Sequence, residues 1–208
     1  MKKVWFIPII FVCQYCFAQP KISKLDKNSI PKNIHYAGHI VNAVRWADTT
    51  GDHIIITTET GETQSKGQDL DDSYKDAALY AYHYIVQTDS LKLIWKVYDF
   101  VKECPLDLKA NYIKNTFAVT DLNKDGKAEI WKMYKTACRG DVSPSDMKII
   151  MYEDNKKYAV RGTNKVKVSE KEYMGGQYTF DEAFKKAPEV FRQYAIQLWK
   201  KNIVDTLE

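Results

Sequence analysis

Short segments in which apolar and polar residues alternate constrain this fold more than any other feature of the sequence. The alternation is clearest in residues 91–102, where every second residue is apolar: Leu91, Leu93, Trp95 and Val97. Successive side chains of a β-strand point to opposite faces, so a period of two predicts a strand with one face in the core. Lys92, Lys96 and Tyr98 are then expected on the other face.

Further strand-like segments follow one another along the chain, with turn signals between them. They span residues 36–47, 53–60, 77–87, 117–120, 128–137, 147–153 and 158–162. Residues 61–75 are polar and are expected to form a loop. Strands joined by short turns favour antiparallel pairing, so the sequence predicts a β-meander or a β-sandwich.

The period of the apolar residues becomes helical near the C-terminus. The residues at helical spacing are Phe191, Tyr194, Ala195, Leu198 and Trp199. Thr179 and Glu182 are spaced as a capping box, and Pro188 is expected to divide the helix because proline disrupts a helix interior. We therefore predict a helix over about residues 180–202, packed on the sheet, and an α+β fold that is mostly β.

The first 18 residues have the pattern of a secretory signal peptide. Lys2 and Lys3 precede an apolar stretch at residues 4–17, and Ala18 provides a small residue for cleavage. The apolar stretch is shorter than the ~20 residues that cross a bilayer, so no transmembrane segment is expected after cleavage. We predict an exported protein of the periplasm, the cell surface or the medium, with a flexible leader at 19–33 and a single domain at 34–208.

Charge and cysteine content limit the partners and the compartment. The full chain of 208 residues has a formal charge of +4, and removal of Lys2 and Lys3 leaves a nearly neutral protein. Such a balance gives no basis for nucleic-acid binding. Cleavage leaves two cysteines, Cys104 and Cys138, which in an oxidising compartment are expected to form a disulfide worth roughly 2–4 kcal/mol. Two separate buried thiols are the alternative.

Residues 119–131 read VTDLNKDGKAEIW and place oxygen-bearing side chains at alternate positions. Calcium takes six or more oxygen ligands, which a tight loop with a glycine at its bend can provide. The candidate ligands are the side chains of Asp121, Asn123, Asp125 and Glu129 and the backbone carbonyl of Lys127. The sequence therefore predicts a calcium ion bound in a hairpin loop.

Two features refine this prediction. An EF-hand requires a glutamate where this chain has Lys132, and its loop lies between helices rather than strands. The spacing instead resembles the strand-loop-strand calcium loops of integrin-type propeller repeats, although a propeller needs several copies and only one is present. The alternative is that Asn123, Asp125 and Gly126 only form the turn of a hairpin.

Tyr80, Tyr82 and Tyr84 alternate within one predicted strand and should line one of its faces, with His83 on the other. A ladder of this kind either stacks against sugar rings or forms an aromatic part of the core, and the core is the simpler interpretation. The catalytic residues remain unknown, since the sequence has no nucleophile elbow, zinc-protease motif or phosphate loop.

Several longer stretches resemble a known family. They are YKTACRGDVSPSDMKIIMY at 134–152, YAVRG at 158–162, DFVKEC at 99–104, LWKKN at 198–202 and VTDLNKDGKAEIW. Across about residues 36–202 the chain is similar to small secreted Bacteroidota proteins assigned to surface polysaccharide biosynthesis. The resemblance implies a role at the envelope, with surface polysaccharide or envelope assembly proteins as partners, and it brings no catalytic residues.

Two functions follow from these observations. The first is a non-enzymatic exported protein that supports the cell surface or its polysaccharide, with a calcium loop and one disulfide. The second is a glycan-processing enzyme whose carboxylates meet only in the fold. A pocket joining the acids of residues 61–76 to Arg139 or His83 would favour the enzyme, whereas a sheet face with exposed tyrosines would favour glycan binding.

Overall fold

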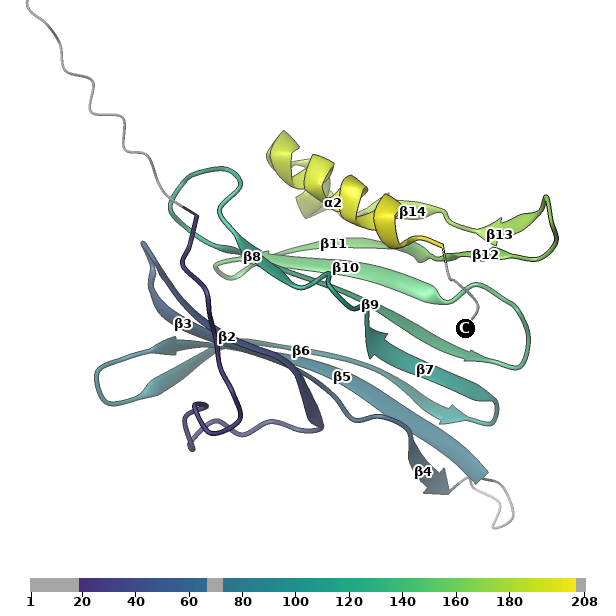
Figure 1. Ribbon diagram of the computed structural model, residues 1–208, viewed down its shortest axis with the longest axis horizontal. Helices are drawn as coiled ribbons and strands as arrows, with labels where there is room; N and C mark the ends of the chain where they lie inside the picture. The colour runs from purple at the N-terminus through teal and green to yellow at the C-terminus, as the bar shows by residue number, and fades with distance from the viewer. Residues whose placement is uncertain (1–18, 67–72, 205–208) are drawn as a thin grey trace, which may run out of the picture.

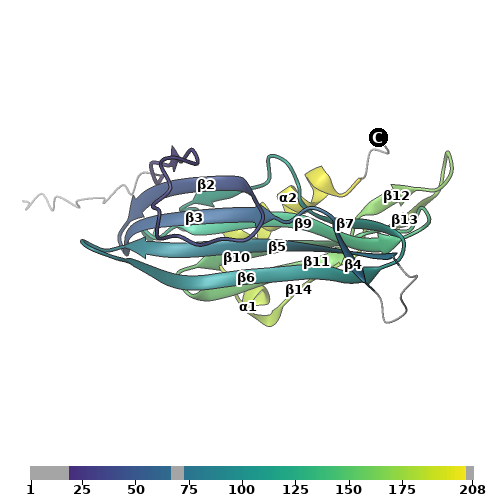
Figure 2. The ribbon, with the colours of Figure 1, turned by 90° about the horizontal axis from the view of Figure 1, so that it is seen from below.

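Two antiparallel six-stranded sheets face each other, and a helix covers the far side of the second sheet (Figure 1). The computed structural model describes residues 19–66 and 73–204, so the predicted signal peptide and three of the loop acids, Asp69, Asp71 and Asp72, lie outside the described residues. The strands of the two sheets run in similar directions (Figure 2), as in an aligned β-sandwich. The predicted fold class, mostly β with a C-terminal helix, is confirmed.

The first sheet is built around one long strand. Its strands are β1 (Ser23–Lys24), β2 (His39–Asp48), β3 (Gly51–Glu59), β4 (Thr63–Lys66), β5 (Ser73–Val86) and β6 (Leu91–Cys104). One edge of β5 pairs with β3 and β4, and its other edge pairs with β6. The β2–β3 hairpin turns at residues 49 and 50, as the sequence predicts, and β1 adds to the far edge of β2.

The second sheet is built around β9. Its strands are β7 (Asp107–Tyr112), β8 (Ala118–Thr120), β9 (Glu129–Arg139), β10 (Asp146–Glu153), β11 (Lys156–Thr163) and β14 (Tyr178–Phe180). Strands β7 and β8 share one edge of β9, and β10 lies along the other. A separate hairpin comprises β12 (Lys165–Lys167) and β13 (Tyr173–Gly175). The helices are α1 (Glu182–Lys185) and α2 (Glu189–Asn202).

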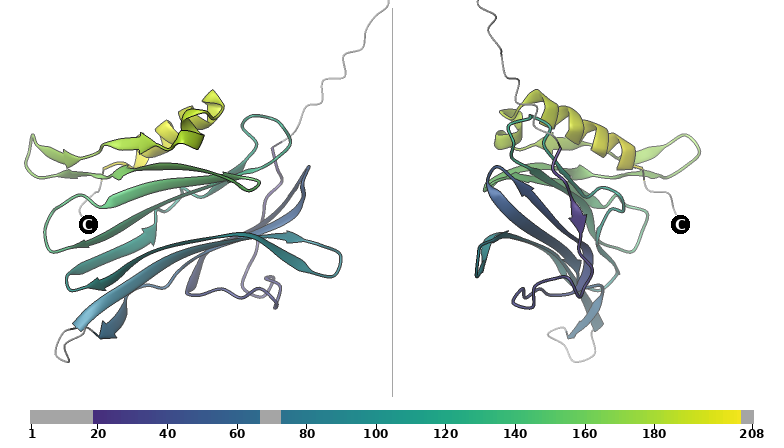
Figure 3. Two further views of the ribbon diagram at one scale, coloured as in Figure 1. Left: turned by 180° about the vertical axis from the view of Figure 1, so that it is seen from behind. Right: turned by 60° about the vertical axis from the view of Figure 1, so that its left-hand side comes forward.

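Figure 3 shows the two sheets and the helices as successive layers, and three apolar clusters hold these layers together. The interior of the sandwich is formed by inward-facing residues of both sheets, among them Trp46, Ile55, Trp95, Ile130 and Tyr152. The outer face of the second sheet packs against α1 and α2. The outer face of the first sheet is covered in part by residues 25–40, where Ile30 and Ile34 are buried.

The Cys104–Cys138 disulfide joins the two sheets. Its S–S distance is 2.09 Å and its Cα–Cα distance is 5.6 Å, which confirms the predicted pairing. Cys104 ends β6 and Cys138 lies near the end of β9. The bond therefore connects the C-terminal ends of one strand from each sheet.

Several local predictions differ from the structure. The predicted loop 61–75 contains β4 and the start of β5. In β6 the register shifts so that His83 pairs with Trp95 and Tyr84 with Leu93, which leaves Ile94 as an extra residue. An extra residue reverses the faces of the strand beyond it, so Leu93 is 46% exposed on the outer face instead of lying in the core.

Two further differences lie at the ends of the domain. Residues 19–33 are not a loose leader, since β1 pairs with β2 and Ile30 is 7% exposed. Thr179 does not cap the helix because it lies within β14, and Asp181 accepts the cap hydrogen bond from the amide of Phe184 instead. The predicted break at Pro188 is confirmed, because α2 begins directly after it.

Both helices of the described residues fall short of the length and hydrophobicity that a membrane-spanning helix needs.

Candidate functional site

The loop between β8 and β9 closes around the carboxylate of Asp121. Its two oxygens accept hydrogen bonds from the backbone amides of Asp125 and Gly126, each at 3.1 Å. Lys124 and Gly126 have φ angles of 58° and 83°, in the left-handed region that a tight loop uses. Asp121 is 3% exposed, so the loop wraps a nearly buried carboxylate.

The alternate side chains of this loop also contact backbone and neighbouring groups. The Asp125 carboxylate accepts a hydrogen bond from the Lys127 amide at 2.9 Å, and the Asn123 side chain donates to Glu153 at 2.9 Å. The Lys127 ammonium forms an ion pair with Asp154 at 2.7 Å. The loop is therefore held from the turn between β10 and β11 as well as from within.

Glu129 completes the row of acids and is fully buried. Both of its oxygens lie 3.0 Å from the Leu122 amide nitrogen, and the Thr120 hydroxyl donates to one of them at 2.7 Å. Burial raises the pKa of this carboxyl to about 7; the hydrogen bonds oppose this rise, and the charge of Asp121 adds to it. The two acids are thus close enough to repel each other when both are charged.

In residues 19–66 and 73–204, no three His, Cys, Asp or Glu side chains gather in a way that could hold a metal ion. The acids of the loop direct their oxygens to backbone amides instead. The predicted ligands all lie in this loop, but their carboxylate oxygens are not gathered around one point. The arrangement is therefore compatible with both the calcium interpretation and the hairpin-turn interpretation.

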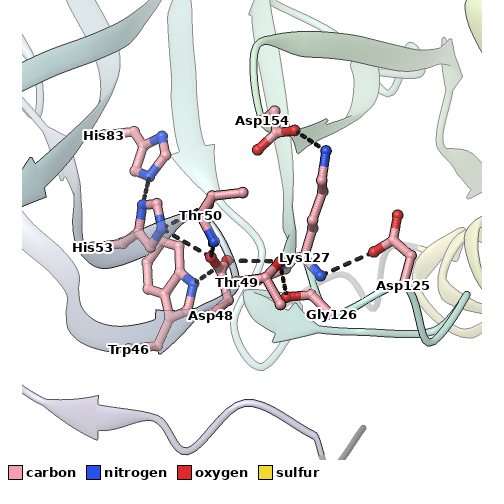
Figure 4. Close-up of polar contacts among 11 residues, drawn as sticks. Trp46, Asp48, Thr49, Thr50, His53, His83, Asp125, Gly126, Lys127 and Asp154 are labelled. Atoms are coloured by element: carbon pink, nitrogen blue, oxygen red, sulfur yellow. Dashed lines mark hydrogen bonds and ion pairs between the residues drawn. The ribbon is translucent and has the colours of Figure 1, made fainter. Parts of the chain in front are cut away.

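The loop is fastened to the β2–β3 turn of the opposite sheet (Figure 4). The Thr49 amide and hydroxyl both donate to the carbonyl of Gly126, at 2.9 and 2.7 Å. In return the amide of Ala128 donates to the Asp48 carboxylate at 3.0 Å. At the loop's other side, the side-chain amide of Gln19 pairs with the backbone of Asp121. Residues far apart in the sequence therefore meet at this end of the sandwich.

A buried polar chain leads from this junction into the core. Asp48 contacts Nε2 of His53 at 3.1 Å, and Nδ1 of His53 contacts Nε2 of His83 at 3.0 Å (Figure 4). Since a neutral imidazole has one donor and one acceptor, donation from His53 to Asp48 leaves its Nδ1 to accept from His83. Burial lowers the pKa of His83 to about 3, and the charges of His53 and Lys132 add to this effect. Both rings are 3% exposed, so they hold the turn but meet no solvent-borne substrate.

Lys132 lies deeper in the same core and is fully buried. Among the residues that the structure describes, its ammonium nitrogen has no hydrogen-bond partner, and it lies 4.4 Å from the ring centroid of Trp95 and 4.7 Å from that of Tyr152. Burial lowers the pKa of this lysine well below its ordinary value, and the charge of Lys157 adds to the effect. The contacts with the two rings compensate in part for the loss of water.

A row of aromatic rings runs along the outer face of β5 and β6, and we call it the aromatic strip. It consists of Tyr82, Tyr80, Tyr98 and Phe100, with centroid separations of 5.8, 5.0 and 4.9 Å and interplanar angles of 18–25°. Centroid separations near 5 Å with small interplanar angles are typical of offset stacking, so the rings are displaced sideways relative to one another.

One end of the aromatic strip is buried and the other end is exposed to solvent. Tyr82 and Tyr84 are buried beneath residues 30–37, as the core interpretation predicts, and the Tyr82 hydroxyl accepts a hydrogen bond from the Ala37 amide. Tyr98 and Phe100, however, are each 45% exposed. Beside them is a hollow of about 170 Å³, which is lined in part by Thr60, Thr63, Ala78 and Lys102.

The remaining predicted features lie in three different places. Asp76 lines the hollow beside the strip, whereas Arg139 lines another near the disulfide and His83 is enclosed in the core. The described residues thus do not join Asp76 to Arg139 or His83 in one of these hollows. Asp141 accepts a hydrogen bond from the Ser143 amide, in the connection between β9 and β10.

No family model, curated protein or solved structure matches this chain. Its function must therefore be inferred from the arrangement of its own residues.

Sequence reasoning missed the residues that only the fold brings together. His53 and His83 are 30 positions apart, and no local motif links them. Tyr98 and Phe100 could have been identified by pairing the predicted strands, because Tyr80 lies directly opposite Tyr98 across the turn at residues 88–90.

Proposed function

We propose that this chain is an exported, non-catalytic envelope protein that binds polysaccharide along the aromatic strip. The observation that carries this proposal is the row of offset rings that ends in Tyr98 and Phe100, both 45% exposed beside a hollow. Export rests on the predicted signal peptide, and the envelope role is also what the family resemblance implies.

The chemistry of the strip suits a sugar chain. Sugar rings present C–H faces that pack on aromatic rings and hydroxyls that hydrogen-bond at the margins, and an exposed apolar row on a soluble protein commonly marks a binding site. Thr60, Thr63 and Asp76 provide hydroxyl and carboxylate groups along the adjoining hollow. A flat, open face of this kind holds a polymer along its length better than it encloses a small molecule.

A glycan array with the mature chain, residues 19–208, tests this function, with both retention and cleavage recorded. We expect retention without cleavage, and binding about tenfold weaker or worse for Tyr98→Ala, which corresponds to about 1.4 kcal/mol. Tyr173→Ala is the matched control, because Tyr173 is also 45% exposed but lies on β13. Retention that is equal in both variants would refute the role of the strip, and cleavage would support the glycan-processing alternative.

We further propose that the 121–129 loop binds calcium as a structural ion. Asp121, Asn123, Asp125 and Glu129 would provide side-chain oxygens, and Lys127 its backbone carbonyl. A carboxylate oxygen has two lone pairs, so oxygens that accept an amide hydrogen keep capacity for a cation. Among the described residues, no lysine or arginine forms an ion pair with Asp121 or Glu129, so a bound cation would offset their mutual repulsion.

Thermal unfolding of the mature chain in calcium and in chelator tests this proposal. For a dissociation constant of ~10⁻⁴ M, 10 mM calcium stabilises by about 2.7 kcal/mol, which corresponds to roughly 5–10 °C. Asp125→Ala should abolish the shift. Asp89→Ala, at an exposed turn outside the loop, should retain it. Equal melting temperatures for the wild type under the two conditions would exclude a structural calcium ion.

A further inference from the structure

Two lysines stand at the two ends of the exposed aromatic strip. The Lys96 ammonium lies 5.0 Å from the ring centroid of Tyr80 and 5.4 Å from that of Tyr82. The Lys102 ammonium lies 5.1 Å from the ring centroid of Phe100. Each ammonium is thus held against a ring, which orients it and leaves its hydrogen-bond donors available.

The spacing of these lysines follows from the strand. Residues at even intervals point to one face, so Lys96, Tyr98, Phe100 and Lys102 all face outward from β6. Six residues of an antiparallel strand span about 20 Å. The strip is therefore an apolar track with a positive charge at each end, long enough for several sugar rings.

No ion pair within 4 Å is found for Lys96 or Lys102 among the described residues. Asp76 is the acid beside Lys102 in the hollow, and its carboxylate accepts hydrogen bonds from the Glu103 amide and the Ser65 hydroxyl. These hydrogen bonds and the charge of Lys102 lower the pKa of Asp76, so Asp76 attracts Lys102 without forming a close ion pair with it. Lys96 and Lys102 are both exposed residues and can reach an anion from solvent.

We infer that the ligand of the aromatic strip is an acidic polysaccharide, whose carboxylate groups pair with Lys96 and Lys102 while its sugar rings pack on Tyr98 and Phe100. This inference rests on the proposed glycan-binding function and specifies its substrate class. A neutral glycan that covered both lysines would remove water from two charges without replacing it, whereas a carboxylate forms charge-assisted hydrogen bonds with them.

Single-stranded nucleic acid is the other polyanion that stacks on aromatic rings. Proteins that bind it combine their rings with a positively charged groove along the whole backbone. Here the positive groups of the strip are confined to its two ends, and the full chain has a net charge of only +4. The arrangement accordingly favours a polymer with widely spaced charges.

Binding measurements with paired probes test the inference. The mature chain is titrated with polygalacturonate, hyaluronan and alginate, with the carboxyl-reduced form of each, and with poly(dT). We expect at least one acidic polysaccharide to bind, with affinity lower by tenfold or more for its carboxyl-reduced form and for Lys96→Gln/Lys102→Gln. Lys200→Gln, at an exposed lysine of α2 on the far side of the molecule, should bind as the wild type does.

The outcomes separate this inference from the function on which it rests. Equal binding of acidic and carboxyl-reduced forms, with no effect of the lysine variant but a loss in Tyr98→Ala, would overturn the acidic class and leave glycan binding intact. The absence of binding to all six polysaccharides and to the glycan array would overturn both. Tighter binding of poly(dT) than of any polysaccharide would assign the strip to nucleic acid instead.

Discussion

Replacement of Lys132 by methionine should stabilise this protein. The lysine is fully buried between the rings of Trp95 and Tyr152, and its ammonium has no hydrogen-bond partner in the described residues. Methionine fills a similar volume without a charge. Exchange of buried charged groups for apolar side chains of similar volume commonly gains about 1–4 kcal/mol, a net value that already includes the contacts that the charges lose. We therefore expect a net gain of about 1–4 kcal/mol near neutral pH.

The stabilisation by Lys132→Met should decrease as the pH rises. The pKa of Lys132 in the folded protein lies well below its ordinary value, because of burial first and the charge of Lys157 second. In the unfolded chain this lysine keeps its proton up to about pH 10.4, so folding favours release of the proton. The free energy of unfolding of the wild type then rises with pH from the lowered pKa up to about 10.4. Lys132→Met lacks this rise, so its advantage is largest at low pH and shrinks as the pH increases.

Urea unfolding between pH 6 and pH 9, followed by tryptophan fluorescence, measures the difference. A gain of 2 kcal/mol corresponds to about 4–8 °C in melting temperature for a chain of this length. Lys167→Met, at an exposed position of β12, is the control and should leave the unfolding midpoint close to that of the wild type. A Lys132→Met variant that is less stable than the wild type, or whose gain grows with pH, would show that the buried ammonium is compensated in a way that this reasoning omits.

Loss of the disulfide, of the Asp48 carboxylate or of Gly38 should each destabilise the fold. Removal of the Cys104–Cys138 disulfide by alanine substitution should lower the free energy of unfolding by about 2–4 kcal/mol, and an unchanged urea midpoint would contradict this. Asp48→Asn should cost about 2–4 kcal/mol at pH 7 through weaker hydrogen bonds. Burial opposes ionisation of Asp48, but hydrogen bonds from His53 and Thr50 keep its pKa well below the ordinary value. The stability difference between the wild type and Asp48→Asn should therefore shrink as the pH falls below about 4. A difference that is independent of pH would show that the negative charge of Asp48 is not its cause. Gly38→Ala should lower the melting temperature more than Gly61→Ala does. Both glycines have a positive φ, but only at Gly38 would a Cβ lie 2.3 Å from a backbone oxygen, that of Glu59. Equal losses in the two variants would assign the whole cost to the backbone angle.

The parts of the fold that were predictable from the sequence are those with a local cause. Alternation located most of the long strands to within a few residues, proline placed the break before α2, and the two remaining cysteines formed the expected bond. The loop 61–75 was predicted less well, because β4 and the start of β5 are polar strands whose pairing with each other creates them. The acids of the 121–129 loop were found from their spacing, and calcium binding there stays a prediction.

The remaining features depend on contacts between distant segments. The extra residue at Ile94 moves Leu93 to the outer face, and nothing in the alternation of residues 91–97 signals it. In the sequence, the position of Lys132 suggests a strand with one solvent-exposed face. In the structure both faces of β9 are covered, one by the first sheet and one by α2. A period of two locates a strand, but it does not reveal whether a second layer covers its polar face.

The aromatic strip lies between two connections that each join β9, or the loop before it, to the first sheet. At one end, the acidic loop before β9 is hydrogen-bonded to the β2–β3 turn. This turn lies near the start of β6, because Asp52 pairs with Val86 and Val86 pairs with Leu91. At the other end Cys138 of β9 is bonded to Cys104, two residues beyond Lys102. An open face that binds a polymer gains affinity when its groups are already fixed in position, because less ordering is required on binding. If the strip binds polysaccharide as proposed, loss of the disulfide should weaken that binding by loosening the Lys102 end. If the 121–129 loop binds calcium as proposed, removal of the ion should act at the opposite end and affect binding less.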